Sequence, residues 1–284
     1  MQIIRTVEQL RKAVDAAKSN QKTIGLVPTM GALHEGHMSL VEKACSANDV
    51  VVVSVFVNPT QFNNANDLQT YPRTEEADCD KLRKAGADIA FVPSVEEIYP
   101  EPDTRRFDLG PVADVMEGAM RPGHFNGVAQ IVSRLFAMVQ PDRAYFGEKD
   151  FQQIAVIRRM AELEGFGLEI VPCPIVRADD GLALSSRNVR LDKHQREIAP
   201  NIHRILTESL EWAKSLTVAE TERRVTEAIN AYPEMEVEYY TIVDRRTMQP
   251  VAEWPTEGEG TVGCVTVYLG DVRLIDNIKY PIAK

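Results

Sequence analysis

Residues 23–58 constrain the fold of this chain more than any other segment. They contain an apolar run at 24–27, a glycine-bearing loop at 29–36, apolar residues at helical spacing, and a second apolar run at 50–57. Strand, loop, helix and strand in this order form a βαβ unit, and the nearly uninterrupted VVVVSVFV of the second run is typical of a strand covered on both faces of a parallel sheet. We therefore predict an α/β fold with a Rossmann-like parallel sheet.

Two loops of this region are candidate parts of a binding site. Ligands of open parallel sheets bind beyond the carboxyl ends of the strands, and the loop at 28–37 lies at such an end. It carries His34 and His37, two of the five histidines in the chain. The polar stretch at 58–73, NPTQFNNANDLQTYPR, follows the second apolar run and is expected to form a loop at the carboxyl end of that strand.

The composition permits a full core and excludes several classes of protein. The chain has 284 residues, of which 44% are hydrophobic, and its net charge of -10 argues against a general nucleic-acid or membrane surface. No apolar run reaches the ~20 residues of a membrane span, and the first residues lack the apolar core of a signal peptide, so we expect a cytoplasmic protein. The cysteines are widely spaced without C-x-x-C, which predicts structural thiols.

The pattern of elements changes after residue 176. Before it, strands and helices alternate; from Asp192 onward, two helices precede extended segments joined by Pro- and Gly-containing turns. We therefore predict a Rossmann-like domain at 1–176 and a smaller C-terminal α+β domain at 177–284.

The sequence H-x-G-H, from His34 to His37, is the strongest chemical signal. At a helix N-terminus, backbone N–H groups attract phosphate, and two imidazoles add donors toward an α-phosphate. Gly31 and Gly36 let the backbone approach a nucleotide closely. Two alternatives remain: the rings only cap the turn, or they share a zinc ion, although H-E-x-x-H and a third ligand are missing. The absence of a Walker A loop and of G-x-G-x-x-G disfavours P-loop kinases and dinucleotide oxidoreductases.

Other polar residues are weaker candidates on their own. Lys149 lies at a predicted strand-to-helix turn, after the strand at 144–146, and suits neutralisation of a triphosphate. Ser185, Ser186 and Arg187 offer hydroxyls and a fixed fork of donors in a glycine-flanked loop that suits closure over phosphates. Each of them reads equally well as an ordinary polar surface group until other motifs are considered.

Two glutamines are candidates for a small substrate. The neutral amides of Gln61 and Gln153 both donate and accept hydrogen bonds, which suits hydroxyl and carboxylate groups.

Seven motifs follow one another along the chain: PTMGALHEGH (28–37), FVNPTQF (56–62), YPRT (71–74), RPGHFNGV (121–128), FGEKDFQQ (146–153), DGLALSSRN (180–188) and LGDVRLIDN (269–277). With these motifs in this order, the sequence resembles the pantoate-beta-alanine ligase family of HIGH-type nucleotidyltransferases. LSSRN corresponds to the KMSKS-like loop of that superfamily.

The resemblance implies an ATP-dependent condensation of (R)-pantoate with beta-alanine. The pantoate carboxylate attacks the α-phosphate of ATP, which gives pantoyl adenylate and pyrophosphate; the amine of beta-alanine then attacks the acyl carbon, which gives pantothenate and AMP. No protein nucleophile is needed, so the catalytic groups act mainly as preorganised donors, and His37 is the family's proton donor. The catalytic set is His34, His37, Lys149, Ser185, Ser186 and Arg187.

The resemblance also implies that the domain at 1–176 is catalytic and binds ATP and pantoate, and it implies the binding site residue by residue. Gln61 and Gln153 bind pantoate, Gln61 also lies by beta-alanine, and Arg121 lies near the substrate. Mg²⁺ accompanies ATP, held largely by phosphate oxygens, and Asp78 matches an acidic residue of the family's metal site. The implied nucleotide contacts are Met30, Gly31, Ala32, Leu33, His34, Glu35, Gly36, His37, Gly147, Glu148, Lys149, Asp150, Val176, Leu184, Ser185, Ser186 and Arg187.

Three further expectations concern assembly and competing functions. The mixed anhydride requires protection from water, so the C-terminal domain, hinged near Arg177, is expected to act as a lid. The family resemblance predicts a homodimer. The H-x-G-H signature also suits a nucleotidyltransferase with a phosphate-bearing acceptor, a fragment of an aminoacyl-tRNA synthetase, or a non-catalytic ATP-binding module, although the acidic chain offers little surface to tRNA.

Overall fold

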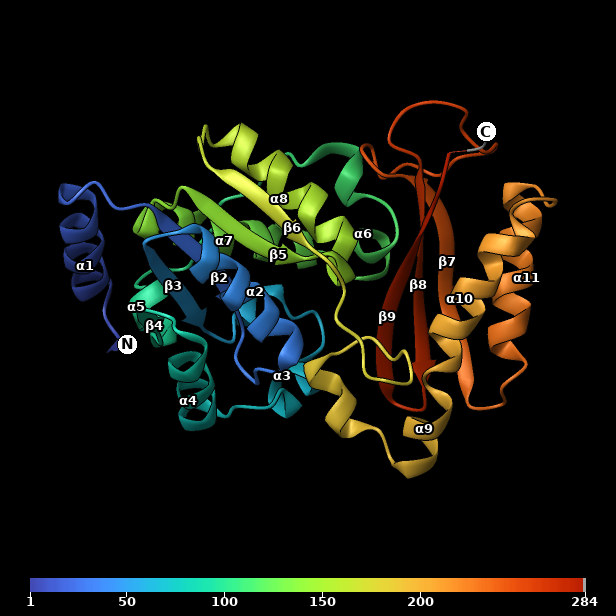
Figure 1. The fold of residues 1–284 in the computed structure, drawn as a ribbon, viewed down its shortest axis with the longest axis horizontal. Coiled ribbons are helices and arrows are strands. Elements are labelled where there is room, and N and C mark those ends of the chain that lie inside the picture. The colour runs from blue at the N-terminus through green and yellow to red at the C-terminus, as the bar shows by residue number, and fades with distance from the viewer. Residues whose placement is uncertain (283–284) are drawn as a thin grey trace. The chain divides into compact units, whose positions relative to one another are not determined.

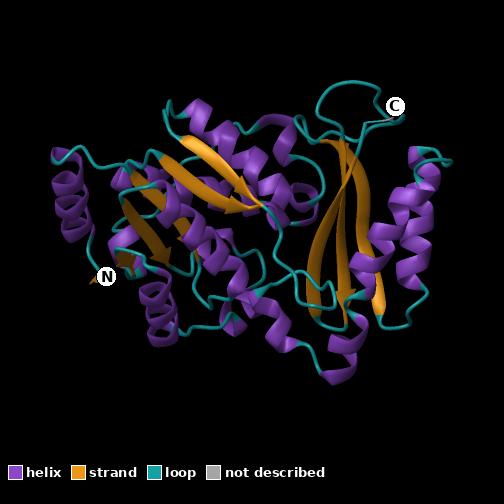
Figure 2. Ribbon diagram, in the orientation of Figure 1, coloured by secondary structure: helices purple, strands orange, loops and turns teal. Residues whose placement is uncertain are grey.

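The computed structural model describes residues 1–282 and contains two separate β-sheets, drawn as orange arrows in Figure 2. The strands of the first sheet are β1 (Gln2–Ile4), β2 (Ile24–Thr29), β3 (Val50–Val55), β4 (Ile89–Phe91), β5 (Arg143–Gly147) and β6 (Glu169–Cys173). Their order in the sheet is β1-β4-β3-β2-β5-β6, and every neighbouring pair is parallel. The predicted Rossmann-like α/β class is therefore confirmed.

The chain divides into two compact units that interleave along the sequence. The first unit comprises Met1–Leu109, Arg121–Glu148 and Val156–Pro174, and the second comprises Gly110–Met120, Lys149–Ala155 and the chain from Ile175 onward. Two segments of the second unit thus precede the boundary that the sequence pattern suggests at residue 176. The division into domains at 1–176 and 177–284 stays a prediction.

Helices follow most strands of the first sheet, as the labels of Figure 1 show. Helix α8 (Phe151–Leu163) begins in the second unit and ends in the first. The other helices of the first unit are α1 (Val7–Ser19), α2 (Glu35–Ala47), α3 (Ala65–Thr70), α4 (Glu75–Ala85), α5 (Val95–Ile98) and α7 (His124–Val139).

The βαβ unit predicted from residues 23–58 is present. Helix α2 connects β2 to β3, and these strands pair in parallel from Ile24–Val50 to Thr29–Val55. Residues 51–55 of β3 are all buried. Since successive side chains of a strand point to opposite faces, this run confirms that both faces of β3 are covered.

Local structure differs from the expected loops in two places. Strand β2 continues through Pro28, which is tolerated because β5 pairs with β2 only at Gly25 and Leu26. The stretch 58–73 contains a 3₁₀ turn, η1 (Pro59–Gln61), and the short helix α3, both capped by asparagine side chains. Helix α6 (Glu117–Met120) ends directly before the motif RPGHFNGV.

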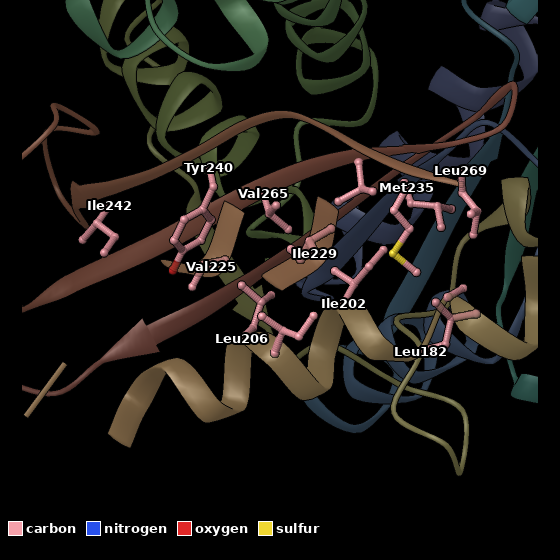
Figure 3. Packing of buried hydrophobic residues seen from close by; sticks show 14 of the residues in the cluster. Leu182, Ile202, Leu206, Val225, Ile229, Met235, Tyr240, Ile242, Val265 and Leu269 are labelled. Carbon is pink, nitrogen blue, oxygen red and sulfur yellow. The ribbon is translucent and has the colours of Figure 1, made fainter. Parts of the chain in front are cut away.

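The second unit has an antiparallel sheet covered by helices. Its strands β7 (Met235–Asp244), β8 (Thr261–Leu269) and β9 (Val272–Tyr280) form hairpin pairs in the order β7-β8-β9. Helices α9 (Lys193–Ile198), α10 (Asn201–Trp212) and α11 (Val218–Asn230) precede them. Figure 3 shows Leu206 of α10 and Ile229 of α11 packed with Val265 of β8 in the apolar core between helices and sheet. The predicted α+β character of the C-terminal part is confirmed.

Two further findings concern membrane-spanning helices and the cysteines. No helix within residues 1–282 combines the length and the apolar character that crossing a bilayer requires. The four cysteines are free thiols, and burial raises the pKa of Cys264 to about 12, which makes it an unreactive core residue.

Candidate active site

The two predicted catalytic histidines lie where the loop after β2 meets α2: His34 ends the loop, and His37 is in the first turn of the helix. His34 is the N-cap of α2, and its Nδ1 accepts a hydrogen bond from the Gly36 N–H at 3.1 Å. The Nδ1 of His37 accepts from the His34 N–H at 3.3 Å, and the two ring centroids lie 4.1 Å apart. Because each Nδ1 is an acceptor, the proton of each neutral imidazole is carried by Nε2. Capping therefore fixes the tautomer in which each ring has its N–H donor at Nε2.

A buried carboxylate holds the backbone of the same loop. Asp78 of α4 is 1% exposed, and its carboxylate accepts hydrogen bonds from the N–H groups of Ala32 at 2.9 Å and Leu33 at 2.8 Å. The Thr74 hydroxyl donates to this carboxylate at 3.2 Å. Gly31 and Ala32 have φ angles of 80° and 51°, which are unfavourable for a residue with a Cβ such as Ala32. The hydrogen bonds to Asp78 stabilise this strained turn.

The amide of Gln61 has a defined orientation. Its Oε1 accepts a hydrogen bond from Asn58 Nδ2 at 3.1 Å, and its Nε2 donates to the Met30 sulfur at 3.2 Å. Asn58 is 1% exposed, and its Oδ1 accepts from the Tyr99 hydroxyl at 2.8 Å and from the Thr60 N–H at 3.4 Å. A backbone N–H can only donate, so the Asn58 amide is fixed and in turn fixes that of Gln61.

An ion pair supports Tyr99 behind this network. The Arg134 guanidinium lies over the Tyr99 ring at 5.0 Å, and Arg134 Nε donates to Asp103 at 2.8 Å. Burial of Asp103 opposes its ionisation, but hydrogen bonds from Arg105 and Arg134 outweigh burial and hold the pKa of Asp103 well below its usual range. The Asp103 carboxylate is therefore charged throughout the neutral pH range. Its ion pair with Arg134, which lies over the Tyr99 ring, persists over that whole range.

The start of α7 contacts the backbone of the Gln61 loop. His124 Nδ1 lies 2.8 Å from the Gln61 carbonyl oxygen, and His124 Nε2 lies 3.2 Å from Arg121 Nη1. Since arginine only donates, Nε2 is the acceptor and the Nδ1–H donates to the carbonyl. A Cβ on Gly127 would lie 2.3 Å from the Thr60 carbonyl oxygen, so only glycine permits this close approach.

Gly127→Ala is expected to weaken binding of the small carboxylic acid that the resemblance assigns to Gln61, while the fold persists. The added Cβ must displace backbone atoms of Thr60, which precedes Gln61, and a shift of ~1 Å at a positioning group costs roughly 10- to 100-fold in kcat/KM. Steady-state kinetics measure this loss, with pantoate, the acid that the resemblance implies, as the varied substrate. Gly167→Ala is the matched control, because nothing lies within 4 Å of its added Cβ. Equal kinetics of both variants would contradict the assignment.

The Ser-Ser-Arg segment of the second unit follows a tight hairpin. The Leu184 N–H donates to the Val176 carbonyl at 3.0 Å, which brings these two predicted nucleotide contacts together. Ser185 Oγ accepts from the Arg187 N–H at 3.3 Å and caps the 3₁₀ helix η4 (Ser186–Arg190). The conformation of this segment is therefore set by its own side chains and by the hairpin.

Lys149 begins a separate segment of the second unit. Its side chain is 17% exposed, and its Nζ lies 3.5 Å from the Asp150 carboxylate. Gln153 lies on α8 four residues further along and is half-buried.

Each unit thus holds a part of the predicted site. The structure brings His34 to His37 and Met30 to Gln61 within the first unit, and Val176 to Leu184 within the second. The convergence of the two sets stays a prediction. The first unit contains Met30 to His37, Gln61, Asp78, Arg121, Gly147 and Glu148, and the second contains Lys149, Asp150, Gln153, Val176 and Leu184 to Arg187.

The alternative zinc site finds no support in the described part of the chain. Within residues 1–282, no group of three or more His, Cys, Asp and Glu side chains is arranged to hold a metal ion. His34 and His37 would therefore have to bind zinc without the further protein ligands that such sites use.

Comparison with known proteins identifies the family. The family model described as Pantoate-beta-alanine ligase matches residues 2–279. The chain belongs to the pantoate-beta-alanine ligase family. This ligase is 60% identical to a pantothenate synthetase of Phocaeicola vulgatus over 281 residues, which cover 99% of each chain.

Solved structures agree with this assignment. This ligase superposes on a pantothenate synthetase from Thermus thermophilus with a TM-score of 0.92 and 48% identity, covering 99% of this chain and 100% of that one. The TM-score with pantoate-beta-alanine ligase from Francisella tularensis, solved with beta-gamma ATP and beta-alanine, is 0.82 at 36% identity, covering 98% and 97% of the chains.

Several positioning residues of this ligase were not singled out from the sequence. Asn58, His124 and Gly127 lie inside the motifs FVNPTQF and RPGHFNGV, but nothing local distinguishes a buried amide or a close-approach glycine from an ordinary loop residue. The available signal was Asn58 directly after a buried strand and before a proline, a position typical of a capping side chain.

Proposed function

We propose that this ligase activates (R)-pantoate with ATP and then joins it to beta-alanine. A carboxylate oxygen of pantoate attacks the α-phosphorus, the new P–O bond forms as the bond to pyrophosphate breaks, and pantoyl adenylate results. The amine of beta-alanine attacks the acyl carbon, AMP leaves with the electron pair of the broken C–O bond, and the amine proton passes to water. The products are pantothenate, AMP and pyrophosphate.

The tautomer of the two histidines is the observation that carries this proposal. Both Nδ1 atoms accept backbone hydrogen bonds, so the proton of each neutral ring is at Nε2. Two imidazole donors at the N-terminus of α2 add to the backbone N–H groups and the helix dipole, and together they favour negative charge on an α-phosphate. In our proposal His34 and His37 stabilise the transferring phosphate, and His37, as the proton donor, gives its Nε2 proton to the departing pyrophosphate and regains one from water.

The remaining site residues form two groups, one for the charged triphosphate of ATP and one for pantoate. Lys149, Ser185, Ser186 and Arg187 provide cationic and hydroxyl donors for the triphosphate, where charge builds up as pyrophosphate departs. Neutral amides at Gln61 and Gln153 suit the hydroxyl and carboxylate groups of pantoate, and Arg121, joined to the Gln61 loop through His124, lies by the substrate.

Mg²⁺ enters this proposal with ATP and is bound through phosphate oxygens. Direct ligation by Asp78, which the sequence suggested, does not fit the local geometry. Its two carboxylate oxygens already accept hydrogen bonds from Ala32, Leu33 and Thr74 inside the protein. We propose instead that Asp78 positions the backbone of the histidine loop.

Asp78→Asn distinguishes these two roles. An amide keeps one acceptor and turns an N–H₂ group toward the other donor, so kcat is expected to fall about tenfold, which corresponds to the loss of one charge-assisted hydrogen bond. The Mg²⁺ concentration that gives half-maximal activity is expected to remain unchanged. Asp80→Asn, at a 59% exposed side chain of the same helix, is the control. A tenfold rise of that Mg²⁺ concentration in Asp78→Asn alone would make Asp78 a ligand.

The proposal extends to domain closure, assembly and location. Pantoyl adenylate is a mixed anhydride, so the site must exclude water while it persists, and we propose that the C-terminal domain at 177–284 serves as the lid. We also propose a homodimer and a cytoplasmic location.

Pyrophosphate exchange tests the proposed first step. Labelled pyrophosphate is expected to enter ATP when pantoate and Mg²⁺ are present, without beta-alanine and without any phosphorylated acceptor. Exchange that requires a phosphate-bearing acceptor, or binding of tRNA at moderate salt, would favour the other nucleotidyltransferase interpretations. Exchange that is absent under all conditions while ATP still binds would indicate a binding module.

A further inference from the structure

We propose that Asp276 and Asn277, adjacent residues of β9, jointly position the Lys149 segment and the Ser-Ser-Arg loop. They end the motif LGDVRLIDN, to which the mechanism assigns no role. Side chains of adjacent strand residues point to opposite faces of a sheet, so one strand reaches two different segments. This inference rests on the proposed function, because it takes both segments as parts of the ATP site.

Asp276 anchors the hairpin that leads to the Ser-Ser-Arg loop. It is 5% exposed, and its two carboxylate oxygens accept hydrogen bonds from the Arg177 guanidinium at 2.6 and 2.8 Å. Arg177 also donates to the Gly181 carbonyl at 3.1 Å, across the turn of the hairpin. A bidentate pair of this kind fixes direction as well as distance, so the hairpin has a defined orientation on β9.

The hairpin transmits this anchoring to the loop. The backbone bridge between Arg177 and Ala183 and the hydrogen bond from the Ala178 N–H to the Leu182 carbonyl at 2.9 Å close it. Only Leu184 separates Ser185 from Ala183, the last residue of this bridge. A small cavity beneath the loop is lined by Ser185, Asn188 and Asp276 among others, so the carboxylate lies close to the loop residues themselves.

Asn277 anchors the other segment. It is 4% exposed, and its Nδ2 donates to the Lys149 carbonyl at 3.1 Å. This bond fixes the backbone from which the Lys149 side chain extends. The same face of β9 carries Arg273, whose guanidinium pairs with Glu117 at 2.6 Å, so a second interaction holds the neighbouring segment 110–120 on that face.

The two anchors make one rigid connection. The Asn277 N–H donates to Asp276 at 2.8 Å, so the two residues are joined by a hydrogen bond in addition to the chain. We infer that the cation of Lys149 and the donors of the Ser-Ser-Arg loop keep a constant separation and meet the triphosphate together. Such preorganisation lowers the barrier because the donors need no rearrangement when charge develops.

Asn277→Ala is the direct test. Loss of the bond to the Lys149 carbonyl is expected to lower the rate of pantoate-dependent pyrophosphate exchange roughly 10- to 100-fold, the cost of a small misplacement of a catalytic group. The control is Asn201→Ala, which removes an equivalent bond from an asparagine Nδ2 to a backbone carbonyl, at Ile198 and 2.8 Å. Both variants are expected to have similar Tm, so a loss of exchange confined to Asn277→Ala is not a stability effect.

A double-mutant cycle separates positioning from general structure. If Asn277 acts through Lys149, Asn277→Ala has little further effect in a Lys149→Ala background, whereas independent effects multiply. Asn277→Ser, which retains a short donor, is expected to recover part of the activity and serves if the alanine variant does not fold. The inference would be overturned if Asn277→Ala exchanged pyrophosphate as fast as Asn201→Ala. It would also be overturned if the effects of Asn277→Ala and Lys149→Ala multiplied fully in the double mutant. A wild-type protein without pantoate-dependent exchange would instead refute the proposed function.

Discussion

His37→Ala is expected to lower the rate of pantoate-dependent pyrophosphate exchange about 10²- to 10³-fold, as removal of one preorganised donor to a developing negative charge does in other enzymes. The neutral ring carries its proton at Nε2, because Nδ1 accepts the His34 N–H at 3.3 Å. Alanine removes the Nε2 donor and also the Nδ1 that accepts from the His34 N–H. The effect should therefore appear in kcat, with a smaller change in the KM for ATP.

A conservative variant and a control test the role of this donor. His37→Gln restores a side-chain donor without the ring and is expected to retain more activity than His37→Ala. His194→Ala is the matched control, because the His194 side chain is 64% exposed and lies outside every site motif. Exchange by His37→Ala at the rate of the control would contradict the role of His37.

Lys149→Ala is expected to cause a loss of similar size, about 10²-fold or more in kcat. A cation at this position neutralises charge that grows on the departing pyrophosphate, and alanine leaves that charge without its partner. The side chain is only 17% exposed, and the carboxylate of Asp150 lies 3.5 Å from its Nζ, which is long for a strong ion pair. The lysine is therefore not committed to a structural salt bridge with Asp150.

The control for this variant is Lys214→Ala, at a side chain that is 68% exposed and paired with Glu211 three residues earlier. Stopped-flow measurement of pyrophosphate release reports the first chemical step without the second. An unchanged rate of pyrophosphate release in Lys149→Ala would contradict a role of Lys149 in the first step. Equal losses of this rate in Lys149→Ala and Lys214→Ala would indicate a nonspecific charge effect.

The fold was predictable where local pattern and long-range structure coincide. The apolar run at 50–57 predicted a strand covered on both faces, and residues 51–55 are all buried. The H-x-G-H loop was found because its position after a strand and before a helix is itself a local pattern. Strand β2 extended past Pro28 because the extent of its pairing with β5, which no local pattern encodes, decides whether proline is tolerated there.

The supporting residues of the site were not predictable in the same way. Asp78 appeared as a metal ligand because only its place after YPRT was visible; its hydrogen bonds to Ala32 and Leu33 join residues more than forty positions apart. Thr74 occupies the N-cap position of α4, yet its hydroxyl donates to Asp78 and makes no capping bond. Contacts of this kind depend on the packed structure, which periodicity and propensity do not specify.

The most direct test of the central claim follows an oxygen atom. When pantoate with an ¹⁸O-labelled carboxylate is converted to pantothenate, attack on the α-phosphorus and later cleavage of the acyl C–O bond must leave one labelled oxygen in the phosphate of AMP. Mass spectrometry of the products is expected to find the label in AMP and none in pyrophosphate. Label in pyrophosphate or orthophosphate, or AMP without label, would show that the acid is not activated by joining AMP.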